Sequence, residues 1–191
     1  SSLDQIRLVD SPSHGTLDLL GAGYYATFGS PGALAAADVA DGKIARDGAY
    51  QTDGGGSSLR ALMSLRHQIS LGKGRLEQRV YGQYRRFDML ENFTGYLQDP
   101  VDGDRRAQMH KFFSAGYQIE YARPIVDTLT LMVGGAWQGD SVAQTDSRVD
   151  AAHAVVQENW DLAIGQHAAH TRAGLRWRPT GWLTLEGGAR A

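Results

Sequence analysis

The side chains in this sequence with potential for metal chemistry are its six histidines and the acids near them. His167 and His170 lie three residues apart, which on a β-strand places them on opposite faces, so they would not chelate one ion together. His153 lies in a polar stretch with Asp146 and Asp150, for which a solvated loop is favoured over a metal site. The sequence therefore predicts no metal site.

Other catalytic and nucleotide-binding patterns are missing. Gly72-Lys73-Gly74 lacks the spacing of a phosphate-binding loop and is typical of a tight hairpin turn, where glycine can take positive φ. There is no G-x-S-x-G nucleophile motif. There is also no cysteine, which excludes disulfides and thiolate chemistry. We therefore predict that the chain is not an enzyme and uses no cofactor.

Composition narrows the class of protein further. The formal net charge is −2, with acidic and basic residues interleaved, so no affinity for nucleic acid is predicted. The 24 glycines, the 9% of aromatic residues and the alternating runs of Val, Thr and Tyr favour an all-β chain. The longest apolar run, 129–137, is far shorter than the ~18 residues of a membrane helix. A membrane location would therefore require a closed β-barrel.

One phrase occurs twice in the second half of the chain. Residues 123–131 (RPIVDTLTL) are echoed by residues 178–185 (RPTGWLTL). Each copy is interpreted as an Arg-Pro turn followed by an alternating Leu-Thr-Leu strand, and each follows an alternating segment that ends in an aromatic residue, Tyr121 or Trp177. This order is typical of an up-and-down antiparallel barrel.

Eight strands are expected along residues 1–191, which form one β-barrel segment. They are predicted at 3–9, 15–28, 59–71, 75–89, 110–122, 128–139, 160–177 and 182–191. Short connections are expected at 10–14, 72–74, 123–127 and 178–181, and long ones at 29–58, 90–109 and 140–159. This alternation is typical of transmembrane barrels with short periplasmic turns and long extracellular loops.

The strands alternate between an apolar and a polar face. Period 2 alone leaves open which face points outward, so a soluble sandwich remains an alternative. Charges of both signs on the polar face favour an apolar face toward lipid, as do the aromatic residues that begin or end the apolar faces: Tyr84, Tyr121, Trp137 and Trp177. His67 falls on the apolar face, which predicts an interfacial position or a bulge. Strand 15–28 is ambiguous, with Leu17 and Leu19 on one face and Leu20, Tyr24 and Phe28 on the other.

Two stretches carry a likeness to a known family. They are residues 83–100, which contain QYRRF, NFTGYL and DP, and residues 176–190, RWRPTGWLTLEGGAR. The chain resembles the barrel portion of TonB-dependent outer-membrane receptors, in which an Arg-Pro-x-x-Trp-Leu-x-Leu turn leading into a Gly-x-Arg strand is common. The likeness covers most of the chain but is diffuse.

The resemblance implies a 22-stranded barrel closed by an N-terminal plug. Such a receptor lies in the bacterial outer membrane, binds a scarce nutrient such as a siderophore-bound metal, and imports it with energy from TonB. The implied partners are outer-membrane lipid, the remainder of the barrel with its plug, TonB and a small-molecule ligand. No plug domain or TonB box is present in residues 1–191, and the expected strand directions predict an interior piece of a longer barrel.

Candidate binding residues lie on the polar face and in the loops. The predicted lumen arginines are Arg60, Arg66, Arg79, Arg85, Arg172 and Arg176, accompanied by Glu77, Glu120 and Glu186. The favoured interpretation is a network of cross-strand ion pairs that holds the wall and a plug; the alternative is a basic path for an anionic ligand such as a ferric chelate. In the loops, Phe93, Tyr96 and Tyr50 are candidates for ligand contact.

Two other functions remain open at this point. One is a self-contained eight-stranded outer-membrane barrel with a structural or adhesive role, whose interior would be filled by side chains. The other is a soluble β-sheet binding module. Detergent partitioning separates the soluble module from both barrels.

Overall fold

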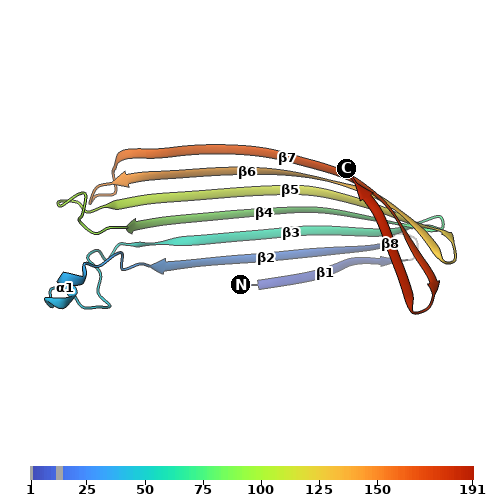
Figure 1. Cartoon of the computed structure of the whole chain (residues 1–191), viewed down its shortest axis with the longest axis horizontal. Helices are drawn as coiled ribbons and strands as arrows, with labels where there is room; N and C mark the ends of the chain where they lie inside the picture. Colours follow the sequence, from blue (N-terminus) through green and yellow to red (C-terminus); the bar gives the residue numbers. More distant parts are fainter. Residues whose placement is uncertain (1, 12–14) are drawn as a thin grey trace.

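The chain folds into one eight-stranded antiparallel sheet. The computed structural model describes the backbone of residues 2–11 and the backbone and side chains of residues 15–191. The strands follow sequence order and each pairs with its neighbour in the chain, which confirms the all-β, up-and-down prediction (Figure 1). They are β1 (Ser2–Ser11), β2 (Gly15–Gly29), β3 (Gly55–Leu71), β4 (Gly74–Asn92), β5 (Arg105–Val126), β6 (Leu129–Val149), β7 (Val155–Thr180) and β8 (Leu183–Arg190), with one short helix, α1 (Ala36–Ala40).

The sheet is a single layer with different ends. Figure 1 shows α1 and the longer loops at one end, here called the loop end, and the tight turns at the other, the short-turn end, where β8 bends across the sheet. In the part of the chain that the structure describes, β1 and β8 are the two edges and do not pair with each other. The sheet is therefore open, which is consistent with part of a barrel.

In the described residues, no helix has the length and apolar character needed to cross a membrane.

The predicted long connections are shorter than expected. The stretch 140–159 was predicted as a loop, but β6 continues to Val149 and β7 begins at Val155. This prediction was wrong because the strands become polar on both faces beyond Gly139, as with Asp140 and Ser141, so hydrophobic alternation disappears while backbone pairing continues. The other two connections are also shorter than predicted, at 30–54 instead of 29–58 and at 93–104 instead of 90–109.

The Arg-Pro segments are strand ends rather than turns. Pro124 lies in β5 and Pro179 in β7, and the pairing register shifts beside each of them. Proline has no N–H to donate to a ladder, so it is placed at such irregularities. The hairpin at Gly72 is confirmed, with φ at 61°. The predicted turn at 10–14 includes residues 12–14, which lie outside the described residues.

The two predicted faces are real. On one face Leu65, Val80, Tyr117 and Trp137 lie in a row across β3 to β6. On the other, Arg66 lies opposite Arg79, which lies opposite Gln118. We call these the apolar face and the charged face.

The two exceptions noted in the sequence keep the regular register. His67 lies on the apolar face opposite Gln78 with no bulge nearby, so the ladder is continuous there. The Gln78 side-chain oxygen accepts a hydrogen bond of 2.7 Å from the Tyr117 hydroxyl. In β2, Leu19 belongs to the apolar face and Tyr24 to the charged face, opposite Leu65 and Arg60 respectively. The ambiguous strand therefore places hydrophobic side chains on both faces.

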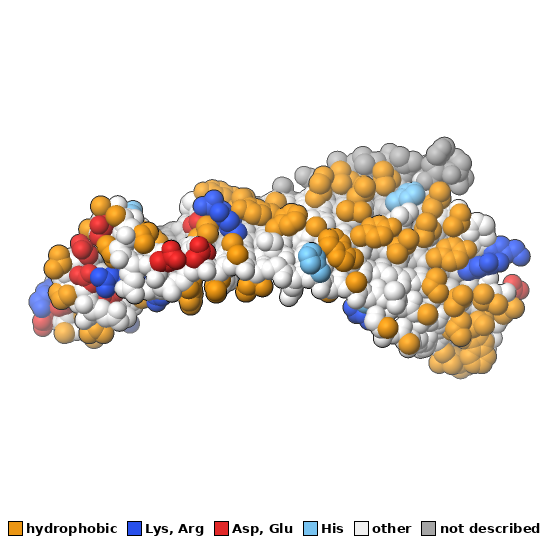
Figure 2. All heavy atoms as spheres, turned by 90° about the horizontal axis from the view of Figure 1, so that it is seen from above, with side chains coloured by type: hydrophobic (Ala, Val, Ile, Leu, Met, Phe, Trp, Pro, Cys, Tyr) orange, Lys and Arg blue, Asp and Glu red, His pale blue; other side chains and the backbone are white. Residues whose placement is uncertain are grey.

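No second layer of described residues covers the apolar face. Val149 is the one buried hydrophobic residue among those described. Met63 and Val80 are 60% and 53% exposed, and Ile119 and Val133, which a soluble core would enclose, are each more than one third exposed. Figure 2 shows hydrophobic side chains spread over the short-turn part of one view and charged ones gathered at the loop end. The apolar face therefore needs a cover that the residues described by the structure do not supply.

Glycines let aromatic rings lie flat on the sheet. On the charged face, Tyr81 crosses over Gly116, where an added Cβ would come within 2.4 Å of the ring. The Tyr81 hydroxyl thereby reaches across β5 and donates to the Gln138 side-chain oxygen at 2.9 Å. Gln138 in turn donates to Asp140 at 2.9 Å. The glycine makes this three-strand connection possible.

Replacing Gly116 by alanine is expected to displace the Tyr81 ring and break its hydrogen bond, which would lower the free energy of unfolding by about 1 kcal/mol. Urea titration of the refolded protein measures this. Gly82→Ala is the matched control, because the nearest atom to its added Cβ is 3.9 Å away. Equal costs for the two variants would contradict the proposed role of Gly116.

Candidate functional site: the charged face and its loops

The backbone register brings the predicted arginines together on one face. Arg60 lies opposite Arg85, and Arg66 opposite Arg79, on β3 and β4. Arg172 joins them from β7, in the row that contains Glu77 and Glu120. The alternation in the sequence was sufficient to predict this grouping, because cross-strand partners always share a face.

Near the short-turn end the arginines are paired with acids. Both Glu77 carboxylate oxygens accept hydrogen bonds from Arg66, at 2.9 and 2.8 Å, and Gln68 adds a third at 2.7 Å. Arg172 pairs with Glu120, and Arg176 with Glu186. These contacts match the favoured interpretation of cross-strand ion pairs for three of the six predicted arginines.

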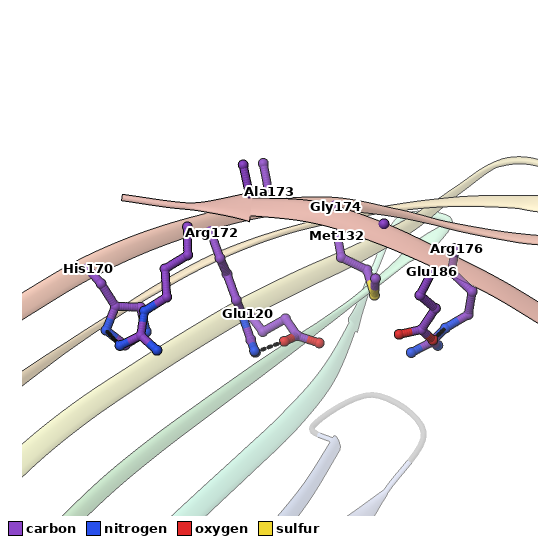
Figure 3. A pocket seen from close by; sticks show the side chains of 12 residues that line it. Glu120, Met132, His170, Arg172, Ala173, Gly174, Arg176 and Glu186 are labelled. Carbon is purple, nitrogen blue, oxygen red and sulfur yellow. Dashed lines mark hydrogen bonds and ion pairs between the residues drawn. The ribbon is translucent and has the colours of Figure 1, made fainter.

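Two of these pairs line a hollow of about 480 Å³ between β5 and β8. Figure 3 shows Glu120, Arg172, Arg176 and Glu186 on one side of the sheet and Ala173 on the other. His170 lies beside them, and its Nδ1 atom is within hydrogen-bond distance, 2.9 Å, of the Arg190 guanidinium. His167, three residues earlier, stacks on Trp137 on the apolar face, so the two histidines are separated by the sheet as predicted.

The other three predicted arginines are arranged differently. Among the side chains that the structure describes, Arg60, Arg79 and Arg85 form no ion pair. The Arg85 guanidinium lies over the Phe112 ring, 5.6 Å from its centroid. Arg79 lies two residues from Glu77 on the same face of β4 and shares that acid with Arg66, whereas no described acid pairs with Arg60 or Arg85.

At the loop end, the 93–104 loop is held by its own carboxylates. Asp104 is buried and accepts hydrogen bonds from the Thr94 hydroxyl and from the backbone N–H groups of Gln98 and Asp99, the last at 2.7 Å. Burial raises the pKa of Asp104, but these hydrogen bonds outweigh it and hold the pKa below its ordinary value. The loop is therefore fixed by an ionised carboxylate.

Asp53 joins its own loop to the start of β5 and to the turn between β6 and β7. Its Oδ2 atom is 2.8 Å from Arg105 NH1 and 2.7 Å from His153 Nε2. The hydrogen bond with His153 is the main reason that the pKa of Asp53 lies below its usual range, and the charge of Arg105 adds to the effect. The His153 imidazole thus bonds Asp53 rather than the carboxylates of Asp146 and Asp150 considered in the sequence, and His153 contacts Asp150 through its backbone N–H, which donates to the Asp150 carbonyl at 3.0 Å. The described residues contain no cluster of three potential metal ligands.

The aromatic loop candidates have different surroundings. Phe93 lines a hollow of about 230 Å³ on the charged face, with Arg106 stacked on its ring at 5.8 Å and Arg148 nearby. Tyr96 instead packs edge-on against Tyr50, with ring centroids 5.7 Å apart. Of the three aromatic residues, Phe93 alone lines this hollow.

Sequence reasoning missed four residues of these surfaces. Arg106 and Arg148 were placed in predicted loops, but they lie on β5 and β6 and face the hollow beside Phe93. Tyr24 and Phe112 flank the Arg60–Arg85 pair, opposite Arg60 and Arg85 respectively. The signal that could have revealed them is the register between strands, which hydrophobic periodicity alone does not supply.

No family model matches this chain, and neither a curated protein nor a solved structure matches it.

Acid is expected to loosen the 93–104 loop. A carboxyl whose pKa is lowered in the folded state stabilises that state above its unfolded pKa, about 3.9 for Asp, and this stabilisation is lost as the pH falls through the lower folded value. Amide hydrogen exchange at Gln98 and Asp99, corrected for intrinsic rates, should therefore be slow from pH 7 to about 4 and accelerate below that.

Asp104→Asn supplies the control. It removes the ionisable group, so exchange at the Gln98 and Asp99 amides should already be fast at neutral pH. The acceleration at low pH that remains after correction for intrinsic rates should mostly disappear. Protection that persists in Asp104→Asn would show that the carboxylate does not hold the loop.

Proposed function

We propose that this chain forms part of a transmembrane β-barrel in a bacterial outer membrane, with its apolar face toward lipid and its charged face toward an aqueous lumen. The single uncovered layer supports this, because lipid covers an apolar face that has no protein partner. A long antiparallel sheet also satisfies its backbone internally, as hydrocarbon requires. The observation that carries the proposal is the slanted line that aromatic residues form across neighbouring strands of the apolar face.

Aromatic residues mark a slanted upper margin of the apolar face. Tyr25 lies level with Arg86, two residues nearer the loop end than Tyr84. Phe113 on β5 lies opposite Tyr84. On β6 the partner of Phe113 is Ser141, and Trp137 lies four residues nearer the short turns than Ser141. The margin thus falls by six residues over the four spacings from β2 to β6.

That slope matches the tilt of strands in a membrane. With ~3.4 Å per residue and ~4.8 Å between strands, six residues over four spacings give about 45°. Strands of transmembrane barrels tilt by roughly 35–45° from the membrane normal. Residues at one depth in the membrane are therefore displaced along successive strands by about this slope. The lower margin runs the same way: Tyr121 is level with Ala173, and Trp177 lies four residues closer to the short turns.

Above the upper margin the same face turns polar. Arg86 and Lys111 lie opposite each other just beyond Tyr84 and Phe113, and Asp88 pairs with Arg86 at 2.7 Å. The apolar segment of β4 from Leu76 to Tyr84 is eight steps, or about 27 Å at ~3.4 Å per residue. Tilted by ~40° it spans roughly 21 Å, most of the ~25 Å apolar band of a barrel.

We further propose that the barrel belongs to a TonB-dependent receptor that takes up a small nutrient such as a siderophore-bound metal. The family resemblance supports this assignment. The open edges of the sheet fit a larger barrel better than a self-contained eight-stranded one. Loops held by Asp53 and Asp104 supply a rigid outer rim on which ligand contacts would be placed.

The orientation of the faces is testable because the chain has no cysteine. Single cysteines at Val133 and Leu175 on the apolar face, labelled with bimane in the refolded full-length protein, should be quenched strongly by lipids brominated on the acyl chains. Gln83→Cys and Gln118→Cys on the charged face are the matched controls and should be quenched weakly. Equal quenching on both faces, or a protein that stays in the soluble fraction, would reject the membrane barrel.

The receptor assignment has its own test. In cells that depend on the full-length protein for growth on a scarce nutrient, uptake should stop when TonB is deleted, while the protein remains in the outer membrane. Uptake that is unchanged without TonB would reject the receptor and leave the barrel standing.

A further inference from the structure

Two arginines on the charged face lie opposite each other, and no carboxylate among the described side chains pairs with either of them. Arg60 on β3 and Arg85 on β4 are direct cross-strand partners, and both are exposed. Two residues farther along the face in each direction, the strands carry Ser58, Leu62, Gln83 and Phe87, none of them acidic. Like charges directly opposite each other destabilise a sheet, so this arrangement has a cost that an anion would remove.

The Arg60–Arg85 pair differs from the other pair of opposed arginines on these two strands. Arg66 lies on the same strand and face and also faces an arginine, Arg79, but both Glu77 oxygens bond to it. The chain therefore neutralises one opposed pair with its own acid. Within the described residues, the Arg60–Arg85 pair has no such acid.

Aromatic rings flank the pair on both sides. Tyr24 on β2 is the cross-strand neighbour of Arg60 and is 44% exposed. Phe112 on β5 is the neighbour of Arg85, whose guanidinium lies over its ring. The row across the sheet thus reads aromatic, arginine, arginine, aromatic, with the charged groups in the middle.

We infer that Arg60 and Arg85 form a binding site for an oxyanion, a carboxylate or phosphate group, with Tyr24 and Phe112 contacting the apolar part of the molecule that carries it. Guanidinium groups bind such anions through paired N–H donors, and two of them provide charge for a multivalent anion. This inference rests on the proposed function for its setting, an aqueous lumen. There Arg85, adjacent to Tyr84 at the upper margin, is accessible from the loop end.

Equilibrium dialysis of the full-length protein in detergent, with radiolabelled pyrophosphate and citrate at constant ionic strength, tests the site. Saturable binding of at least one probe is expected, and Arg60→Gln and Arg85→Gln should each weaken it tenfold or more. Arg85→Lys, which keeps the charge but loses the planar donor fork, should fall between wild type and Arg85→Gln. Arg75→Gln is the matched control, because Arg75 is an exposed arginine on the same strand and face as Arg85 but lies at the short-turn end, and it should bind within twofold of wild type.

Failure to bind either probe, or an equal loss in Arg75→Gln, would overturn the site. The same chemistry could be supplied by a carboxylate from another segment of the full-length protein. In that case the wild-type protein binds neither probe, and Arg85→Gln lowers the midpoint temperature of thermal unfolding. If the arginine pair has no such internal partner, Arg85→Gln leaves that temperature unchanged or raises it. Outer-membrane fractionation of the same preparation separates this outcome from failure of the proposed barrel, which would place the protein in the soluble fraction.

Discussion

The structure depends on an apolar sheet face that the described chain does not cover. A sheet with one apolar face is stable only when that face is removed from water, by a second protein layer or by lipid. Here the described residues form one layer, and Val149 alone among them is a buried hydrophobic residue. The cohesion seen within the chain is therefore backbone pairing between neighbours, and the hydrophobic contribution to stability must come from outside it.

The same strand register arranges the side chains of the charged face, but the pairing of arginines with acids differs between the short-turn end and the loop end. Toward the short turns, cations and carboxylates alternate across strands, as with Arg66 and Glu77, and satisfy each other. Partly exposed pairs of this kind are each worth under about 1 kcal/mol, so they define the wall more than they stabilise it. Nearer the loop end, Arg60 and Arg85 have no such partner among the side chains that the structure describes. The difference matters for function because a neutralised arginine has little charge left to offer a ligand.

The loop end shows how a polar region can be ordered without a hydrophobic core. Asp104 and Asp53 each gather several donors, from one loop in the first case and from two other segments in the second. Ionised carboxylates accept more hydrogen bonds than neutral groups, and buried donors need acceptors, so a few acids fix many backbone groups. This gives the sheet a defined rim beyond the apolar band, consistent with its proposed role in contacting a ligand.

The sequence by itself determined the all-β class, the strand order and the membership of each face, because period-2 alternation assigns residues such as Leu131 and Arg172 to faces before any pairing is known. It did not determine where strands end once both faces are polar, so residues around Asp140 were wrongly assigned to a loop, and Pro124 was wrongly assigned to a turn. Only the tertiary structure decided which arginines are neutralised and that Tyr24 and Phe112 flank the Arg60–Arg85 pair. The physical reason is that register is a relation between strands, fixed by backbone pairing across the sheet, and periodicity within one strand carries no information about it.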